Sequence, residues 1–522
     1  MIAWRLPAGV GLALLVAYVA TLAPGVTYWD SGEFLAAIRT LGIPHPPGTP
    51  LFILVGNVWA KVLGPVVGFA YAVNLLSAFC TAAACAIFVY LMHRWTGDAW
   101  ASGAGGLLAG LMSSVWLNAN ETEVYAPALL VSALLILVAD NARLRGEGKW
   151  LVLFGYFCGL GWALQLSALV AVPGALALLI GAKRYASWGR LSITILGAAL
   201  LGASAVLFML VRAQHDPGVN QGNPETWQAF VDVIQRAQYQ PASMLPRQAP
   251  WYIQAGNLFE YADWQVALGL APGAPPAWTR TPFTIVYGGL GVAGWLWHRG
   301  AHRVSWRAMT VLFTVATLGV ITYLNMKAGP SYGHGFLPPG AKHEARERDY
   351  FFALAFVWWG IWAGAGAVRI LARAGARGRY GGLGIAALPF LLNYQAVDRS
   401  AAPDATAARD SAIRMLSPAP ARAVVFAYGD NDTYPVWYAQ HVEGLRQDVT
   451  VVTIPLLGAA WYRAELERRH GLLGATDVAS WRGAEATAGA ICEAARDQGR
   501  PVVAVAVRER VSIPEVCRAS FY

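Results

Sequence analysis

Residues 68–92 read GFAYAVNLLSAFCTAAACAIFVYLM, a stretch of 25 residues without a single charged side chain. A membrane-spanning helix needs about 20 predominantly apolar residues, so this stretch is long enough to cross a bilayer. Further apolar runs lie on both sides of it within the first 395 residues. The sequence therefore predicts an α-helical polytopic membrane protein.

The composition divides the chain into two parts. Of its 522 residues 56% are hydrophobic and 13% are charged, whereas a soluble domain has roughly 25% charged residues. The first 397 residues hold 25 Lys/Arg and 15 Asp/Glu, and residues 398–522 hold 14 Arg and 15 Asp/Glu. Because the net charge of +9 belongs to the membrane part, where basic loops set orientation, no nucleic-acid partner is expected. We expect a transmembrane domain at 1–397 and a soluble domain at 398–522.

The distribution of charged residues predicts the orientation of about eleven spans. The segment 150–181 is too long for one span, and treating it as a hairpin places every basic loop on one side. Fifteen Lys/Arg then lie inside, and 12 of the 15 carboxylates before residue 398 lie outside. The N-terminus is expected in the cytoplasm and residues 398–522 outside it, in the periplasm of a bacterial inner membrane. The candidate spans are 6–23, 68–92, 99–117, 124–140, 150–165, 167–181, 191–211, 281–297, 307–325, 350–371 and 380–394. The expected outside loops are 24–50, 212–280 and 326–349.

The first outside loop, 24–50, contains Asp30-Ser-Gly-Glu33 and a histidine between prolines, His45. Residues three apart share one face of a helix, so Asp30 and Glu33 are expected side by side. A partly desolvated carboxylate can act as general base toward a hydroxyl. The alternative is structural, because an acid followed three residues later by Glu is also typical of a helix N-cap. His45 is either a binding residue or an ordinary loop residue.

Charged residues also mark the outer ends of later spans. Glu121 and Glu123 are two apart and would diverge on a helix, and they could instead stabilise a helix start. Arg346 and Arg348 lie at an outer face, where the positive-inside rule does not explain them. Arginine suits bidentate phosphate binding, although a salt-bridge cluster with Glu347 and Asp349 is the alternative.

The long loop 212–280 begins at Arg212 and is rich in aromatic residues. Loops of this length are uncommon and often functional. Its Trp and Tyr residues could stack on sugar rings, or they could lie at the membrane interface, where both types are enriched.

The C-terminal part is predicted to be a small α/β layer. Strands are expected at 423–427, 449–454 and 502–507, with helices running to 443 and over 461–469. Ligands of such sheets bind beyond the carboxyl ends of the strands, where Asp430 and Asp432 follow the first strand. Capping of the next helix is the alternative role of this loop. Cys492 and Cys517 could pair if this part is outside the cytoplasm, which the sequence does not decide.

Seven motifs in matching order resemble a membrane family that includes the animal transmembrane O-mannosyltransferase acting on plexin-type IPT domains, and bacterial members. These are Asp30-Ser-Gly-Glu33, His45-Pro-Pro-Gly48, Glu121-x-Glu-Val-Tyr125, Asn223-Pro-x-Thr-Trp227, Arg346-Glu-Arg-Asp-Tyr350, Asp398-Arg-Ser400 and Gly429-Asp-Asn-Asp-Thr-x-Pro435 with Trp437-Tyr438. The family is similar to GT-C glycosyltransferases, which take a sugar from a polyprenyl-phosphate donor on the non-cytoplasmic side.

The resemblance implies roles for the residues in these motifs. Asp30 becomes the favoured base, with Glu33 as its neighbour, and Arg346 and Arg348 become candidates for the donor phosphate. The implied substrate-binding residues are His45, Glu121, Glu123, Arg212, Asp349, Asp430 and Asp432 together with the two arginines. The implied reaction transfers a hexose, such as mannose, to an acceptor hydroxyl on protein Ser/Thr or on a glycan. No cofactor is certain, and a divalent cation assisting the phosphate remains open.

The alternative function is that of a transporter or lipid-handling protein without transferase activity. Such proteins place ionisable groups at mid-depth in the membrane and often contain inverted repeats. Here Lys61 is the main intramembrane candidate, and it lies before the second expected span. No inverted repeat is evident, so the transferase is the favoured hypothesis.

Overall fold

The computed structural model describes residues 4–180, 188–239, 243–273, 275–504 and 517. The chain forms two compact units, each built from several separate segments. Unit 1 comprises residues 1–22, 74–205 and 241–399, and unit 2 comprises residues 23–73, 206–240 and 400–522. Unit 2 thus combines the C-terminal part with two segments from the N-terminal half of the chain.

Unit 1 is helical throughout its described secondary structure. Its longer helices are α1 (Arg5–Ala20), α4 (Phe69–Thr96, mostly in this unit), α5 (Ala99–Leu111), α6 (Ser113–Ala119), α7 (Tyr125–Arg145), α8 (Gly148–Leu164), α9 (Val172–Leu179), α10 (Trp188–Ala203), α13 (Trp251–Trp264), α14 (Thr281–Ala301), α15 (Arg303–Thr314), α16 (Val320–Leu324), α17 (Ala353–Leu371) and α18 (Gly378–Val397). Short 3-10 or π segments are η1 (Leu166–Ala171), η2 (Ser204–Val206), η4 (Leu268–Leu270), η5 (Val315–Gly319), η6 (Asp349–Phe352) and η7 (Ala372–Ala374).

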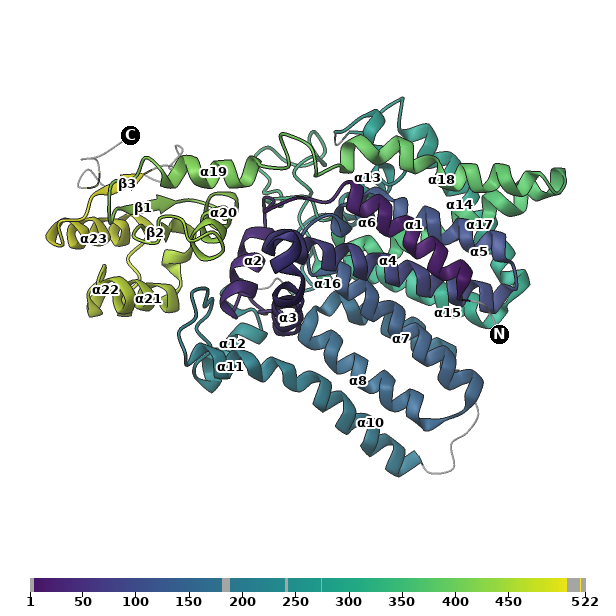
Figure 1. The fold of residues 1–522 in the computed structure, drawn as a ribbon, viewed down its shortest axis with the longest axis horizontal. Coiled ribbons are helices and arrows are strands. Elements are labelled where there is room, and N and C mark those ends of the chain that lie inside the picture. The colour runs from purple at the N-terminus through teal and green to yellow at the C-terminus, as the bar shows by residue number, and fades with distance from the viewer. Residues whose placement is uncertain (1–3, 181–187, 240–242, 274, 505–516, 518–522) are drawn as a thin grey trace. The chain divides into compact units, whose positions relative to one another are not determined.

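The helices of unit 1 pack closely along their lengths. Helices α7, α8 and α10 run side by side, and α17 packs between α5 and α14 (Figure 1). Gly294 of α14 and Gly366 of α17 show why small residues are needed there. A Cβ atom would lie 1.8 Å from the Trp362 carbonyl oxygen at Gly294 and 2.0 Å from that of Leu290 at Gly366. Close backbone approach of this kind is typical of membrane helix pairs.

The apolar runs form helices, as expected. Among the described residues, six helical stretches are long and apolar enough to cross a membrane, and each of the expected spans is helical over most of its length. Within 150–181 the α-helix ends at Gln165, where the backbone is extended (φ −168°, ψ 137°). The six stretches are α3 (Pro50–Val67), Phe69–Thr96, Tyr125–Arg145, Gly189–Ala213, Arg303–Leu324 and Asp349–Ala374. The sequence analysis had not included α3, because Lys61, Gly64 and Pro65 interrupt its apolar pattern.

Unit 2 contains helical segments from the N-terminal half of the chain and a three-layered α/β region. Its elements are α2 (Ser31–Thr40), α3, α11 (Leu207–Ala213), α12 (Trp227–Ile234), η3 (Ala237–Tyr239), α19 (Ala407–Leu416), β1 (Val424–Ala427), α20 (Asp430–His441), β2 (Thr450–Thr453), η8 (Ile454–Gly458), α21 (Ala460–His470), α22 (Ala475–Ala479), α23 (Ala484–Asp497) and β3 (Val502–Ala504).

The sheet of unit 2 is parallel and has the strand order β2-β1-β3. Helices cover both of its faces, and the central strand β1 is buried along its whole length. One core contains Phe426 and Ile491, and the other contains Val425 and Val436. The three predicted strands are confirmed, and so are the helices predicted after the first and second strands. Residues 505–507 of the third predicted strand lie outside the described residues. The short apolar runs fold as strands because both faces are buried.

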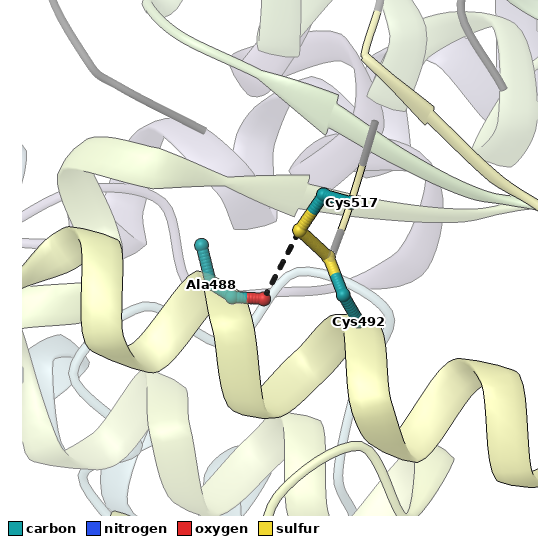
Figure 2. Close-up of a disulfide and its surroundings, with 3 residues drawn as sticks. All are labelled: Ala488, Cys492 and Cys517. Carbon is teal, nitrogen blue, oxygen red and sulfur yellow. Dashed lines mark hydrogen bonds between the residues drawn. A yellow bond between two sulfur atoms is a disulfide. The ribbon is translucent and has the colours of Figure 1, made fainter. Parts of the chain in front are cut away.

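A disulfide joins Cys492 of α23 to Cys517 (Figure 2). Their Cα atoms are 5.5 Å apart, which is within the range that a disulfide can bridge. Both cysteines belong to the core that also contains Phe426. The pairing that the sequence left open is therefore present in the structure. Cys80, Cys85 and Cys158 are free.

Candidate functional site

The Asp30-Ser-Gly-Glu33 motif opens helix α2 and packs against α20 within unit 2. Asp30 is the N-cap residue, but its side chain makes no capping hydrogen bond. A Cβ atom at Gly32 would lie 2.4 Å from the carbonyl oxygen of Tyr434, so only glycine lets the two helices approach this closely. The backbone N–H of Trp29 donates to Oδ1 of Asn431 at 2.7 Å. Two motifs about 400 residues apart in the sequence thus pack against each other.

Glu33 is fully buried and accepts hydrogen bonds from three directions. Its Oε2 lies 2.5 Å from Nδ1 of His45, and its Oε1 accepts the backbone N–H of His45 at 2.7 Å. The amide of Gln221 donates to the same Oε1. We call Glu33, His45 and Gln221 the acid network. Because Glu33 is engaged in this way, it does not serve as the capping-box residue of α2.

Burial raises the pKa of the Glu33 carboxyl, and the neighbouring His45 opposes that effect. The negative charge of Asp30 adds to the increase. Burial also raises the pKa of the Tyr434 phenol well above its usual value, and the charges of Glu33, Asp430 and Asp30 act in the same direction. Asp30, Glu33 and Tyr434 therefore share one electrostatic environment, in which Asp30 is also buried, with an exposed fraction of 9%.

The segment after α11 forms the other wall of this environment. Ile43 and Asn220 form an isolated parallel bridge, which brings Gln221 next to Glu33. Arg212, a predicted substrate-binding residue, donates from Nε to the Leu41 carbonyl at 2.9 Å and from Nη2 to the Thr40 carbonyl at 3.0 Å. It thereby satisfies carbonyl groups at the end of α2, and its role in substrate binding stays a prediction.

Gln221 and Asn431 were not singled out from the sequence. Both are uncharged loop or helix-start residues, and neither has a characteristic spacing. A weak signal existed in each case, because Gln221 precedes the Asn223-Pro motif and Asn431 lies inside the Gly429–Pro435 motif.

Asp430 and Asp432 lie in the first turn of α20, directly after β1. Asp430 is exposed and Asp432 is half-buried. The N-cap residue of α20 is Gly429, which has no side chain that could cap the helix. Acids in the first turn are favourable with the helix dipole. Their position beyond the carboxyl end of a parallel strand is the one expected for a ligand-binding loop.

In unit 1, Arg346 and Arg348 converge on one phenol oxygen. Nε of Arg346 donates to the hydroxyl of Tyr350 at 3.0 Å, and Nη1 of Arg348 donates to it at 2.7 Å. Nη2 of Arg348 also reaches Oε2 of Glu344 at 3.2 Å. We call Arg346, Arg348, Tyr350 and Glu344 the arginine cluster. Both arginines are half-buried, so each retains accessible surface.

The acids next to the arginine cluster form hydrogen bonds with neighbouring hydroxyl groups. Glu347 accepts hydrogen bonds from the hydroxyl of Tyr261 at 3.0 Å and from the hydroxyl of Ser331 at 2.5 Å. Ser331 also reaches Glu260 at 3.3 Å, and burial together with Glu347 raises the pKa of Glu260 to about 7. Asp349 accepts a hydrogen bond from the hydroxyl of Ser114 at 2.5 Å. Neither Glu347 nor Asp349 forms the predicted salt bridge with the arginines among the ion pairs described.

Glu121 and Glu123 lie in the connection between α6 and α7, also in unit 1. Glu121 is half-buried and Glu123 is 8% exposed. The ring of Tyr125, which follows them, packs on the ring of Tyr350 with centroids 4.7 Å apart. The Glu121–Tyr125 motif therefore contacts the arginine cluster through aromatic rings.

Within the described part of the chain, no group of three or more His, Cys, Asp or Glu side chains is arranged to hold a metal ion.

Comparisons with known protein families agree with these motifs. The domain described as "Protein O-mannosyl-transferase TMEM260 N-terminal domain" matches residues 30–189, and "TMEM260-associated domain 2" matches residues 408–472. The first begins at Asp30 and the second contains the Gly429–Pro435 motif. In these two segments the chain is similar to the TMEM260 proteins.

Two TMEM260 relatives give the extent of the similarity. The protein O-mannosyl-transferase tmem260 of Dictyostelium discoideum is 24% identical over 254 residues, which cover 44% of this chain and 30% of the relative. The mouse TMEM260 (Mus musculus) is 34% identical over 170 residues, covering 30% of this chain and 24% of the relative. The matched regions therefore span less than a third of either relative.

The fold has a solved counterpart. The crystal structure of ArnT from Cupriavidus metallidurans bound to undecaprenyl phosphate aligns with a TM-score of 0.52 and 12% identity, covering 86% of this chain and 90% of ArnT. At this identity the likeness concerns the fold alone. The protein is a multi-pass membrane protein with a mostly helical, GT-C-like fold and a small C-terminal α/β region, as the sequence analysis expected.

Proposed function

We propose that this protein is a GT-C glycosyltransferase that moves a hexose, such as mannose, from a polyprenyl-phosphate donor to a hydroxyl of a protein acceptor. The observation that carries the proposal is the buried Glu33 network beneath Asp30, in a motif matched by the O-mannosyl-transferase TMEM260 domain. A merely structural N-cap would bond the helix N–H groups, and Asp30 does not. The name of the TMEM260 relatives supports mannose as the sugar and protein as the acceptor.

In the proposed reaction, Asp30 is the general base. The acceptor oxygen attacks C1 of the sugar, the bond from C1 to the phosphate oxygen breaks, and the acceptor proton moves to the Asp30 carboxylate. The sugar configuration at C1 is inverted and the polyprenyl phosphate leaves. Glu33 is a positioning residue, since its oxygens are already occupied by His45 and Gln221. A fixed base of this kind contributes roughly 10²–10⁴-fold to a rate.

Arg346 and Arg348 are the proposed ligands of the donor phosphate. A leaving phosphate needs a fixed positive charge, and guanidinium groups supply it with two parallel donors. The phenol oxygen of Tyr350 supports this role because it orients both side chains and carries no charge, while Arg348 also forms an ion pair with Glu344 at 3.2 Å. His45, Glu121, Glu123, Arg212, Asp349, Asp430 and Asp432 remain proposed substrate-binding residues. A transmembrane domain at 1–397 and a soluble domain at 398–522 also remain part of the proposal.

The proposed orientation places the N-terminus in the cytoplasm and residues 398–522 outside, in the periplasm of a bacterial inner membrane. Two observations support an outside location. The basic residues gather in the loops that the predicted topology places on the opposite side, and the disulfide between Cys492 and Cys517 is of a kind that persists in oxidising compartments.

The deciding experiment incubates the purified protein in lipid with a panel of polyprenyl-phosphate sugars and measures which donor loses its sugar. We expect one hexose donor to react and Asp30→Asn to lower the rate by roughly 10³-fold while folding and insertion are retained. Asp232→Asn is the matched control, because Asp232 is exposed and bonds only Gln228 on its own helix. Wild-type turnover in Asp30→Asn would show that another group is the base.

A further inference from the structure

Unit 2 contains a cavity of about 380 Å³ that the reaction proposed above does not use. It lies between residues 218–221, helix α20, the start of β2 and helix α21. Its volume is in the range of small-molecule sites. Gln221 lines this cavity and also bonds Glu33, so one residue belongs to both the cavity and the acid network.

The charged groups of the cavity neutralise one another. The guanidinium of Arg469 contacts Oδ1 of Asp216 at 2.5 Å and Oε1 of Glu465 at 2.9 Å. It also donates to the carbonyl of Pro217 at 2.6 Å. With its donors engaged in this way, Arg469 offers little to a phosphate or carboxylate ligand.

The two histidines of the cavity are also uncharged near neutral pH. Burial, with Arg469 nearby, lowers the pKa of His441, and burial lowers the pKa of His470 to about 4. The cavity therefore selects against strongly charged ligands of either sign. A neutral ligand with many hydrogen-bonding groups fits its walls.

The other residues that line the cavity include aromatic rings and carboxamide side chains. Trp437 and Trp461, both half-buried, line the cavity together with Gln440 and the exposed Gln447. The amide nitrogen of Gln440 already donates to the carbonyls of Arg446 and Val449, so its oxygen is the group left for a ligand. An indole presents a broad apolar face, whereas carboxamides donate and accept hydrogen bonds. This combination suits a sugar ring, whose C–H face is apolar and whose edge carries hydroxyl groups.

Asn220 supplies an independent indication that a ligand completes this site. Its side chain is 3% exposed, and its amide nitrogen donates to Oδ1 of Asn223 at 2.8 Å. Its own Oδ1 is buried and has no hydrogen-bond partner in the structure. A buried acceptor without a donor costs free energy, and a ligand hydroxyl would satisfy it. Asn220 lines the cavity.

We propose that this cavity is a carbohydrate subsite that binds a neutral hexose unit attached to the acceptor, with a hydroxyl donating to Asn220 and the ring stacking on Trp437 or Trp461. The role of the sugar as part of the acceptor rests on the proposed transferase function. The protein then acts on an acceptor that already carries a sugar, which is held beside the acid network through Gln221.

The test measures sugar binding without transfer. Purified full-length Asp30→Asn protein, with no donor present, is titrated with methyl α-mannoside and methyl α-glucoside and followed by tryptophan fluorescence and saturation-transfer NMR. We expect saturable binding of at least one glycoside, with a dissociation constant on the order of millimolar. A sugar-free threonine peptide should not compete. Competition by this peptide would identify the cavity as a polypeptide site and overturn the proposal.

Two variants and a matched control locate the binding. Trp461→Ala should weaken binding at least tenfold, and the milder Trp437→Phe should weaken it several-fold with an unchanged melting temperature. Trp481→Ala is the control, because Trp481 is 45% exposed, belongs to the same unit and does not line the cavity. The proposal of a carbohydrate subsite would be overturned if no glycoside bound, or if all three variants bound the glycoside equally well. Neither result would affect the transfer assay with Asp30, so the two proposals fail separately.

Discussion

The acid network of unit 2 and the arginine cluster of unit 1 differ in how deeply their charged groups are buried and how fully these groups are hydrogen-bonded. Glu33 is fully buried, and both of its oxygens are taken up by His45 and Gln221. Arg346 and Arg348 are half-buried and share one phenol oxygen. A saturated buried acid holds its surroundings in place, whereas the half-buried guanidinium groups, which bond Tyr350 and, for Arg348, Glu344, keep part of their surface exposed. The comparison predicts that variants of the first change stability and activity together, and that variants of the second change activity alone.

The largest effect on stability is expected from Glu33→Ala. Removing this carboxylate leaves the backbone N–H of His45 and the amide of Gln221 without an acceptor in a buried place. We expect a loss of roughly 3 kcal/mol in the free energy of unfolding, together with loss of transfer. Thermal unfolding in detergent measures this, with the exposed Glu225→Ala as control. Equal melting temperatures for both variants would show that the network is not structural.

Arg348→Ala tests the arginine cluster, the second of the two regions compared. We expect kcat/KM for the donor to fall by about 10–100-fold, because a charge-assisted contact to phosphate contributes roughly 1.5–3 kcal/mol. The melting temperature should change little, and Arg348→Lys should restore only part of the activity. Arg369→Ala is the control, since Arg369 is 47% exposed and pairs with Asp98. A melting temperature that falls as far as in Glu33→Ala would remove the distinction between the two regions.

A pH titration tests the buried acid beside the arginine cluster. Because the pKa of Glu260 is raised to about 7, its stabilising effect is complete below the unfolded value near 4.5 and is lost as pH rises through 7. The unfolding free energy of the wild type should therefore fall between pH 5 and 8, by up to about 2 kcal/mol. Glu260→Gln should flatten this part of the curve, and Glu225→Gln should leave it unchanged. An identical slope in Glu260→Gln would contradict the raised pKa.

The smallest effect is expected from Tyr350→Phe. This change removes the hydroxyl that accepts from both arginines but keeps the ring that packs on Tyr125. Losing one such contact should raise the KM for the donor about two- to fivefold and leave kcat nearly unchanged. Tyr350→Ala should have a larger effect, because the ring contact is lost as well. Comparable kinetics for both variants would show that the hydroxyl does not orient the arginines.

Local sequence patterns predicted the elements well and the contacts poorly. Long apolar runs gave helices such as Phe69–Thr96, and the runs of β-branched residues gave strands such as Val424–Ala427. These assignments succeed because each depends on a repeating pattern within one segment. The helix Pro50–Val67 was missed because Lys61, Gly64 and Pro65 interrupt its pattern.

The candidate site was only partly predictable for the same reason. The three-residue spacing identified Asp30 and Glu33 as neighbours on a helix. The partners Gln221 and Asn431 are separated from their contacts by 188 and 402 residues, and no local pattern marks such pairs. The contacts of Arg212 with the carbonyls of Leu41 and Thr40 were equally invisible in the sequence, and its implied role in substrate binding stays a prediction.

The close approach at Gly32 bears on how this protein can be shortened or recombined. The change in composition near residue 398 invites a cut there, as if the α/β region were an interchangeable attachment. Helix α20 nevertheless lies against α2, and Asn431 accepts the N–H of the residue before Asp30. A chain cut at 398 would leave the candidate base on a helix whose packed face had become open to water. A chimera that keeps the active-site geometry intact must exchange both helices as a single piece.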